Sequence, residues 1–224
     1  MNSRDWAKIY NDIALDLGLS QPDDYLASEI LSGMLGDRSR ISNLDPFIGQ
    51  PANVYGNGPM LARDMEESPR GLEIVADSAI STYLKHRGVP DIIVTDLDGN
   101  MSEIIECSLS GSLVVIHAHG DNIGRLNEFV PSIQGRVIGT TQNSPLWNVF
   151  NFYGFTDGDR SAYLADFLGS PEIRLIGFDF LKPGSKENQD VERKIRKLRW
   201  AERLLALLAS ERGKSLENGR IIRI

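Results

Sequence analysis

The sequence predicts an α/β fold with an open, mostly parallel sheet, helices on both faces and a helical hairpin at the N-terminus. Three observations predict it. Short apolar runs rich in β-branched residues recur after residue 51, helical segments separate them, and the runs are apolar on both faces. Strands of this kind are buried on both sides, which is typical of parallel sheets built from βαβ crossovers.

The N-terminal part reads as two helices. Apolar residues recur at helical spacing over residues 6–17 and again over residues 26–34, where the stripe ends at Gly36. A polar connector with two prolines follows. We therefore predict a helical extension over residues 1–50 and a catalytic α/β domain over residues 51–224.

The second part of the chain alternates candidate strands with candidate helices. The expected strands are ANVYG, LEIVA, DIIVTD, SLVVIHA, RVIGT and EIRLIG, with IIRI as a final strand. The expected helices include residues 78–87, 157–168 and 187–209. The last helix has a basic face, which we interpret as solvated surface and which consists of Arg193, Lys194, Arg196, Lys197 and Arg199.

Composition excludes several classes of protein. With 24 Lys and Arg against 31 Asp and Glu, the net charge of −7 argues against a nucleic-acid partner. The lone Cys107 and the absence of a CxxC pair argue against a disulfide scaffold and against structural zinc, and they favour a reducing cytoplasm. Neither a signal peptide nor a membrane span is expected. An anionic substrate would need a cation such as Mg²⁺ between it and the acidic residues.

An acidic turn, Thr95-Asp96-Leu97-Asp98-Gly99, follows the third expected strand. Ligands of open α/β sheets bind outside the carboxyl ends of the strands, so this is a position where chemistry is expected. Carboxylates two residues apart at such a turn suit Mg²⁺. The alternative is an Asx-turn or helix cap without a ligand.

The segment HAHGDN ends the fourth expected strand and contains two of the three histidines of the chain. In an extended strand, His117 and His119 lie on the same face. Gly120 would let the backbone approach a ligand closely. Two alternatives remain: structural histidines, or a zinc site made by the two histidines with Asp121.

Two further motifs concern phosphate. In GFTDGDR, Thr156 or Asp157 begins a helix whose N-terminus favours an anion, and Arg160 can donate bidentately to a phosphate; a plain helix cap is the alternative. Gly56 and Gly58 follow the first strand about 20 residues before Asp77, but the third glycine of the dinucleotide fingerprint is missing. A nicotinamide site therefore stays open as an alternative.

Taken in order, these segments resemble one family. The set VYGNGP, VAD, GVPD leading to TDLDG, HAHGDN, GFTDGDR and GFDF is similar to the archaeal 6-hydroxymethyl-7,8-dihydropterin diphosphokinases from about residue 52 to 200. The same stretch resembles thiamine pyrophosphokinase more distantly. There TDLDG replaces a GDxDS turn, and Gly99 stands where that family has serine, so no role of the serine is carried over.

The resemblance implies a reaction and roles for named residues. The hydroxymethyl oxygen of the pterin would attack the β-phosphorus of ATP, giving the pterin diphosphate and AMP, with Mg²⁺ as cofactor. His119, with His117 as the alternative, would be the general base, and Arg160 would stabilise phosphate oxygens. The remaining implied sites are metal-binding (Asp96, Asp98, Asp121), ATP-binding (Gly56, Asn57, Gly58, Asp77, Ser78, Gly120, Asn122, Thr156) and pterin-binding (Asp157, Asp159, Asp179).

Other functions remain open from the sequence. Bacterial relatives of this domain resemble enzymes that act on nucleotide sugars, so a glycosyltransferase is one alternative. A nucleotide-binding module without turnover is another. The expected partners are ATP and a reduced pterin, with no nucleic acid and no membrane. A homodimer is compatible with the sequence, which does not fix the oligomeric state.

Overall fold

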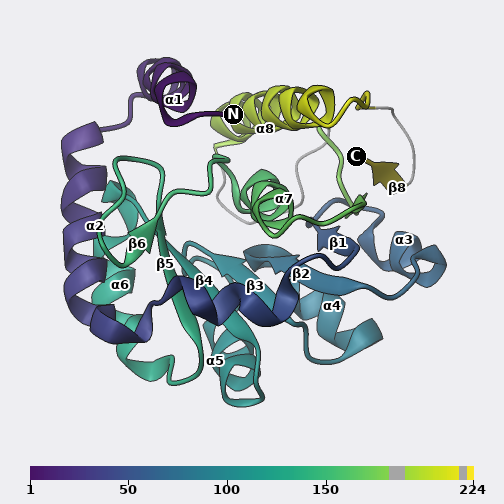
Figure 1. The fold of residues 1–224 in the computed structure, drawn as a ribbon, viewed down its shortest axis with the longest axis horizontal. Coiled ribbons are helices and arrows are strands. Elements are labelled where there is room, and N and C mark those ends of the chain that lie inside the picture. Colours follow the sequence, from purple (N-terminus) through teal and green to yellow (C-terminus); the bar gives the residue numbers. More distant parts are fainter. Residues whose placement is uncertain (182–189, 217–220) are drawn as a thin grey trace.

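The computed structural model describes residues 1–181, 190–216 and 221–224. These residues form an eight-stranded sheet (Figure 1). All strand pairs are parallel except the last, in which β8 runs antiparallel to β7. The strands are β1 Ala52–Tyr55, β2 Leu72–Ala76, β3 Ile92–Thr95, β4 Leu113–Ala118, β5 Val137–Thr141, β6 Val149–Phe150, β7 Ile173–Ile176 and β8 Ile221–Arg223. The predicted fold class is confirmed, and so is the final strand.

The strand order creates a switch point between β1 and β7, the sixth and seventh strands across the sheet. The order is β6-β5-β4-β3-β2-β1-β7-β8, so the chain runs outward from β1 to β6 and then returns to place β7 on the other side of β1. The loops that leave β1 and β7 touch where they begin and then lead to helices on opposite faces of the sheet. In open α/β sheets this divergence opens a crevice in which ligands bind.

Two layers of helices cover the sheet (Figure 1). Val54, Ile74 and Val94 face one hydrophobic cluster, whereas the alternate strand positions face the other. The first layer contains α1 Ser3–Leu17, α7 Asp157–Phe167 and α8 Val191–Glu211. The second contains α2 Gln21–Leu35, α3 Leu61–Glu67, α4 Ile80–Arg87, α5 Met101–Leu109 and α6 Ile123–Phe129. Burial on both faces explains why the strand sequences are apolar throughout.

The two N-terminal helices predicted from the sequence are present. The side chain of Asn2 caps the start of α1, and Gly18 ends it with a φ of 65°, a left-handed conformation that glycine adopts easily. The side chain of Ser20 caps α2. The two helices diverge, because α1 packs against α8 while α2 packs against β4, β5 and α6. The division of the chain at about residue 50 stays a prediction.

Several short elements were not expected. The connector after α2 forms two 3₁₀ helices, Gly36–Arg38 and Ile41–Phe47, and it buries Leu44 and Phe47 in the core. Other 3₁₀ turns are Asp77–Ala79, Gly120–Asn122 and Val130–Ser132. α3, α5, α6 and β6 have few residues each, so periodicity marks them weakly. α8 begins after its cap, Asp190, and the expected helical residues 187–189 lie outside the described part of the chain.

Candidate active site

Two adjacent cavities lie among the described residues at the carboxyl edge of the sheet. The first, the switch-point cavity, has a volume of about 170 Å³ and lies between the loops after β1 and β7 and the start of α7. The second, the histidine cavity, has a volume of about 290 Å³ and lies between the end of β4, the start of α7 and the link from α1 to α2. Both are lined by Asp96, Asp157 and Lys197. A group bound between these three side chains would therefore be accessible from either cavity.

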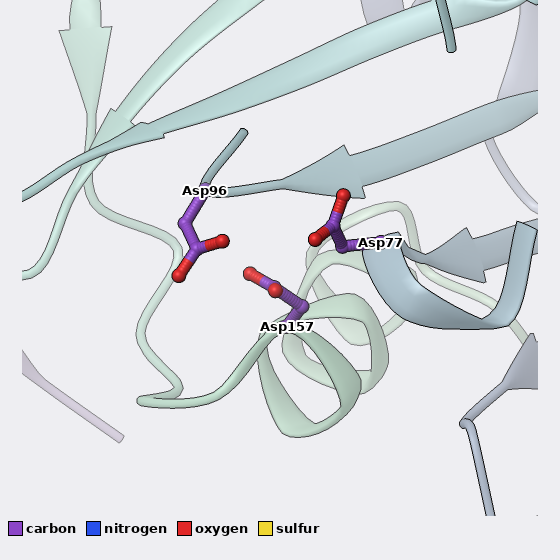
Figure 2. A group of neighbouring side chains, drawn as sticks. All are labelled: Asp77, Asp96 and Asp157. Atoms are coloured by element: carbon purple, nitrogen blue, oxygen red, sulfur yellow. The ribbon is translucent and has the colours of Figure 1, made fainter. Parts of the chain in front are cut away.

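Three carboxylates converge at the boundary of these cavities. Asp77 follows β2, Asp96 follows β3 and Asp157 is the first residue of α7. One oxygen atom from each lies within 4.8 Å of the others, and Figure 2 shows the three side chains pointing toward one another. Hard oxygen donors at this spacing suit a divalent cation such as Mg²⁺.

Hydrogen bonding leaves part of this cluster unsatisfied. Asp77 accepts a hydrogen bond from the Thr95 hydroxyl (2.7 Å) through Oδ1. In contrast, Asp77 Oδ2 and Asp96 Oδ1 are buried and have no hydrogen-bond partner among the described residues. Buried carboxylate oxygens without a partner are costly unless a cation or donor reaches them. The donor set therefore fits a metal ion.

The electrostatics of the cluster point the same way. Burial, Asp157, Asp98 and Asp96 raise the pKa of Asp77 well above its ordinary value. Burial and the same acidic neighbourhood raise the pKa of Asp157, against the opposing effect of Arg160. Burial also acts to raise the pKa of Asp96, but His119, Arg160 and Lys197 outweigh it and hold that pKa at about 2. A cation would relieve the repulsion among these carboxylates.

The TDLDG turn brings Asp96 and Asp77 together. Leu97 has a φ of 66°, and its N–H donates to the Thr95 hydroxyl oxygen (2.8 Å). A Cβ atom on Gly99 would lie 2.6 Å from Asp77 Oδ1, so the close approach of the carboxylate requires glycine at this position. Asp98, the other predicted ligand of this turn, is exposed and lines the switch-point cavity outside the triad.

The glycines of the switch-point cavity allow the loops after β1 and β7 to touch. The N–H of Gly58 donates to the carbonyl oxygen of Gly177 (2.7 Å), and a Cβ atom on Gly58 would lie only 2.4 Å from that oxygen. Asn57, Ser78, Thr156 and Asp179 line the same cavity, as do Gly56 and the apolar side chains of Phe178, Phe180 and Leu198. The cavity thus combines backbone and polar groups with an apolar wall.

Basic side chains reach both cavities. Arg160 is buried, donates to Asp157 (2.9 Å) and to the Phe155 carbonyl oxygen (2.7 Å), and lines the histidine cavity. Lys197 lines both cavities, and Lys194 lines the switch-point cavity. The interpretation of the α8 basic face as solvated surface is therefore wrong for these two lysines. Only the packing of α8 over the sheet places these lysines opposite the acidic strand ends, so the sequence alone does not reveal this position.

The two histidines occupy different environments. His119 is partly exposed, and its Nε2 lies 3.4 Å from Asp96 Oδ2. His117 is 1% exposed, with Nδ1 3.3 Å from the Thr140 hydroxyl and no partner for Nε2 within the described chain. Burial, together with Arg160 and His119, lowers the pKa of His117 well below its ordinary value. His117 is therefore a neutral imidazole at physiological pH.

Three predicted residues do not take the roles that the family resemblance implies. Asp159 is fully buried, and its carboxylate accepts from the N–H groups of Phe155 and Thr156, so it caps α7 and lines neither cavity. The amide of Asn122 donates to the carbonyl oxygens of Asp96 and His117 and ties two strand ends together. Asp121 borders the histidine cavity with Gly120, but its side chain is 70% exposed, faces Arg193 at 3.6 Å and lies outside the triad.

The fold and the site together define a class. The molecule is an α/β protein with a switch-point crevice, a carboxylate triad that fits a divalent cation, and basic groups beside the triad. This combination is typical of enzymes that act on phosphate esters. No helix within the described ranges is long and apolar enough to cross a membrane.

Comparison with known proteins identifies the family. The sequence model of the family described as "6-hydroxymethylpterin diphosphokinase MptE-like" matches residues 34–184, and the chain belongs to this family. Among its relatives are three archaeal proteins, each named 6-hydroxymethyl-7,8-dihydropterin pyrophosphokinase. The protein of Pyrococcus furiosus is 37% identical over 97% of this chain and 99% of its own length. Those of Methanocaldococcus jannaschii and Methanothermobacter thermautotrophicus are 34% and 39% identical, over 93% and 78% of this chain and 96% and 77% of theirs.

Proposed function

We propose that this protein transfers diphosphate from ATP to the hydroxymethyl group of 6-hydroxymethyl-7,8-dihydropterin, producing the pterin diphosphate and AMP. The names of the relatives support the reaction. The observation that carries it is the carboxylate triad at the boundary of two cavities, both lined by Asp96, Asp157 and Lys197. A two-substrate transfer needs such a common boundary, where an acceptor oxygen can reach the phosphorus of a nucleotide.

We propose Asp77, Asp96 and Asp157 as the residues that hold Mg²⁺, in place of the set Asp96, Asp98 and Asp121 expected from the family resemblance. The two unpartnered oxygens of Asp77 and Asp96 support this choice. When bound, the cation would neutralise phosphate charge beside the reacting phosphorus. Asp98 lies beside Asp77, where it affects the charge of the site without belonging to the triad.

The side chains of this protein then position the substrates and move one proton. The acceptor oxygen forms a bond to the β-phosphorus, the bond from that phosphorus to the oxygen shared with the α-phosphorus breaks, and AMP leaves. His119 is the candidate base for the hydroxyl proton, and Asp96, 3.4 Å from its Nε2, would stabilise the imidazolium that results. Arg160 and Lys197 stabilise the phosphate oxygens.

The direct test is incubation of the purified protein with ATP, Mg²⁺ and the reduced pterin, followed by chromatography of the nucleotide products. We expect AMP and pterin diphosphate in equal amounts. ADP as the nucleotide product, or release of a nucleotide from a sugar donor, would contradict the proposal and favour another transferase. ATP binding without turnover would favour a nucleotide-binding module, and a spectral response to NAD(P)H would favour an oxidoreductase.

Cellular context belongs to the proposal as well. The free, buried Cys107 agrees with a reducing compartment, so we expect the enzyme to act in the cytoplasm. A homodimer stays a prediction of the sequence, which sedimentation of the purified protein would test.

A further inference from the structure

The N-terminal helices form the outer wall of the histidine cavity. Gly18, Leu19 and Ser20, from the link between α1 and α2, line it together with Asp23 and Asp24 of α2. These residues precede the part of the chain that the family model matches, which begins at residue 34. The cavity is therefore incomplete without the N-terminal helices and the link between them.

Asp24 fixes this wall to the strand ends. It is 4% exposed, and its carboxylate accepts hydrogen bonds from the Tyr10 hydroxyl, from the Gln142 amide (2.7 Å) and from the Gly120 N–H (2.7 Å). The Trp6 indole donates in turn to the Gln142 carbonyl oxygen (2.8 Å). One buried carboxylate thus joins α1, α2, the turn after β4 and the end of β5. An outer wall held in this way has a defined shape before any ligand binds.

The charge of the histidine cavity changes along its length. Arg160 and Lys197 line its inner end beside the triad, whereas Asp23, Asp24 and Asp121 line its outer part. Of these three carboxylates, Asp24 is hydrogen-bonded within the wall and Asp121 faces Arg193, so Asp23 is the exposed acidic group that a ligand would meet. An acidic outer wall would repel the charged end or the phosphates of a nucleotide. It favours an uncharged ring system rich in N–H and NH₂ donors, because carboxylates are acceptors only.

His117 supplies a more specific signal at the same cavity. The Thr140 hydroxyl donates to the Ile116 carbonyl oxygen (3.1 Å), so toward His117 its oxygen acts as an acceptor. This contact fits the tautomer protonated at Nδ1, in which Nε2 is a buried acceptor without a hydrogen-bond partner among the described residues. An acceptor buried to this extent is expected to find a donor when the cavity is filled.

We infer that the histidine cavity is the acceptor subsite, in which His117 Nε2 accepts a hydrogen bond from an N–H group of the substrate's amino-pyrimidinone ring and the N-terminal helices form the outer wall. The inference rests on the proposed function and assigns its two substrates. The nucleotide occupies the switch-point cavity, with its glycine loops, apolar wall and two lysines. The two substrates meet at the triad, where diphosphate is transferred.

The first experiment concerns the hydrogen bond at His117. Steady-state kinetics are measured for His117→Leu, which removes the acceptor, and for His117→Gln, whose amide oxygen can replace Nε2. We expect His117→Leu to raise the KM for the pterin by about 10-fold, the size of one hydrogen bond to an uncharged group, with an unchanged KM for ATP. His117→Gln should recover most of the loss. A KM increase for ATP instead of the pterin would overturn the inference.

A second experiment changes an exposed residue, so that a folding defect in the buried core does not affect the result. Asp23 is exposed on the outer wall, and Asp12 is exposed on α1 outside both cavities, so Asp23→Arg and Asp12→Arg make the same charge change at two places. We expect Asp23→Arg to raise the KM for the pterin several-fold and to leave the KM for ATP unchanged, while Asp12→Arg changes neither. A lower KM for ATP in Asp23→Arg would place the nucleotide in the histidine cavity and overturn the inference.

Direct binding separates this inference from the proposed reaction. The fluorescent oxidised compound 6-hydroxymethylpterin is titrated into the wild type and into Asp23→Arg without ATP, and its emission is followed. Weaker binding to the variant supports the acceptor subsite even if the wild type forms no AMP, in which case the proposed reaction alone fails. Equal binding to both proteins overturns the subsite, and AMP formation by the wild type would then leave the reaction intact.

Discussion

At the scale of single residues, Asp77 illustrates how a site can oppose stability. Its carboxylate is 1% exposed, beside Asp96 and Asp157, and it has one oxygen without a partner in the described chain. Such an arrangement is costly without a cation and useful with one. Activity and stability should therefore respond in opposite directions when the charge of Asp77 is removed.

We predict that Asp77→Asn abolishes turnover and stabilises the metal-free protein at neutral pH. The amide oxygen can still accept from Thr95, and the negative charge is gone. The melting temperature should rise by roughly 2 to 4 °C for each kcal/mol of repulsion removed, whereas kcat should fall at least about 100-fold. Differential scanning calorimetry in EDTA and a kinetic assay in Mg²⁺ measure the two effects.

The pH dependence has a definite sign. Because the pKa of Asp77 is raised in the folded state above its ordinary value of 3.8, its contribution to stability is present below that value and is lost as pH rises through the folded pKa. The stabilisation by Asp77→Asn should accordingly be small at pH 4 and grow toward neutral pH. Asp45→Asn, an exposed change outside both cavities, is the control and should alter neither property. A destabilised Asp77→Asn protein at pH 7 would contradict the argument.

His119 allows a second prediction at this scale. General-base catalysis contributes about 10² to 10⁴ in rate, so His119→Ala should lower kcat by that order and leave the KM for ATP nearly unchanged. His117→Gln provides the comparison, because it changes the neighbouring histidine while keeping an acceptor. Steady-state kinetics with both substrates varied would test the assignment. If His119→Ala retains full kcat, His119 is not the general base and another group removes the proton.

At the scale of elements, α8 carries its basic residues toward two different surroundings. Lys194 and Lys197 face the cavities, whereas Arg199 is exposed. The N-terminus of α7 lies across from them, with Thr156 as its cap and Asp157 as its first residue. The two helices pack against each other, so the N-terminus of α7 and the two lysines of α8 line the same switch-point cavity.

We predict that Lys197→Met weakens nucleotide use. Methionine keeps most of the apolar stem but removes the ammonium group that lies between the cavities. The KM for ATP should rise, or kcat fall, by about 10-fold or more, as expected for a charged group beside phosphates. Arg199→Met on the exposed side of α8 is the matched control and should leave the kinetics unchanged. Wild-type kinetics in Lys197→Met would contradict the prediction and show that Lys197 has no role in nucleotide use.

At the scale of the whole molecule, the triad connects elements that are distant in sequence. Asp77 and Asp96 belong to the loops after β2 and β3, and Asp157 belongs to α7, which packs over β1, β2, β3 and β7. A cation that binds all three carboxylates must therefore bind the folded chain much more tightly than the unfolded one. Metal binding should stabilise the entire domain.

We predict that Mg²⁺ raises the melting temperature of the wild type and does not raise that of Asp77→Asn. At 100 times its Kd a ligand contributes about 2.7 kcal/mol, which for a chain of this size corresponds to roughly 5 to 10 °C. Thermal unfolding in increasing MgCl₂, with NaCl at matched ionic strength as the control, measures it. Equal responses of the two proteins would show that the stabilising cation binds elsewhere.

Local patterns in the sequence determined the fold class, seven of the strands and the loops that carry the site. Periodicity is a property of consecutive residues, and strand-end motifs follow directly from it, so both can be read without a structure. The family resemblance led to the reaction. The sequence did not predict the short elements α3, α5, α6 and β6, because each has too few residues to show a periodic apolar pattern.

The tertiary structure alone decided which of these residues meet. Asp121 and Asp157 both lie at acidic turns, and the sequence could not rank them as partners of Asp96. Packing of α7 over the centre of the sheet brings Asp157 into the triad, while the turn after β4 directs the side chain of Asp121 toward solvent and Arg193. For the same reason, the sequence did not show that the lysines of α8 line the cavities or that α1 and α2 form a wall of the histidine cavity. Their roles depend on contacts between segments far apart in the chain, which no local pattern encodes.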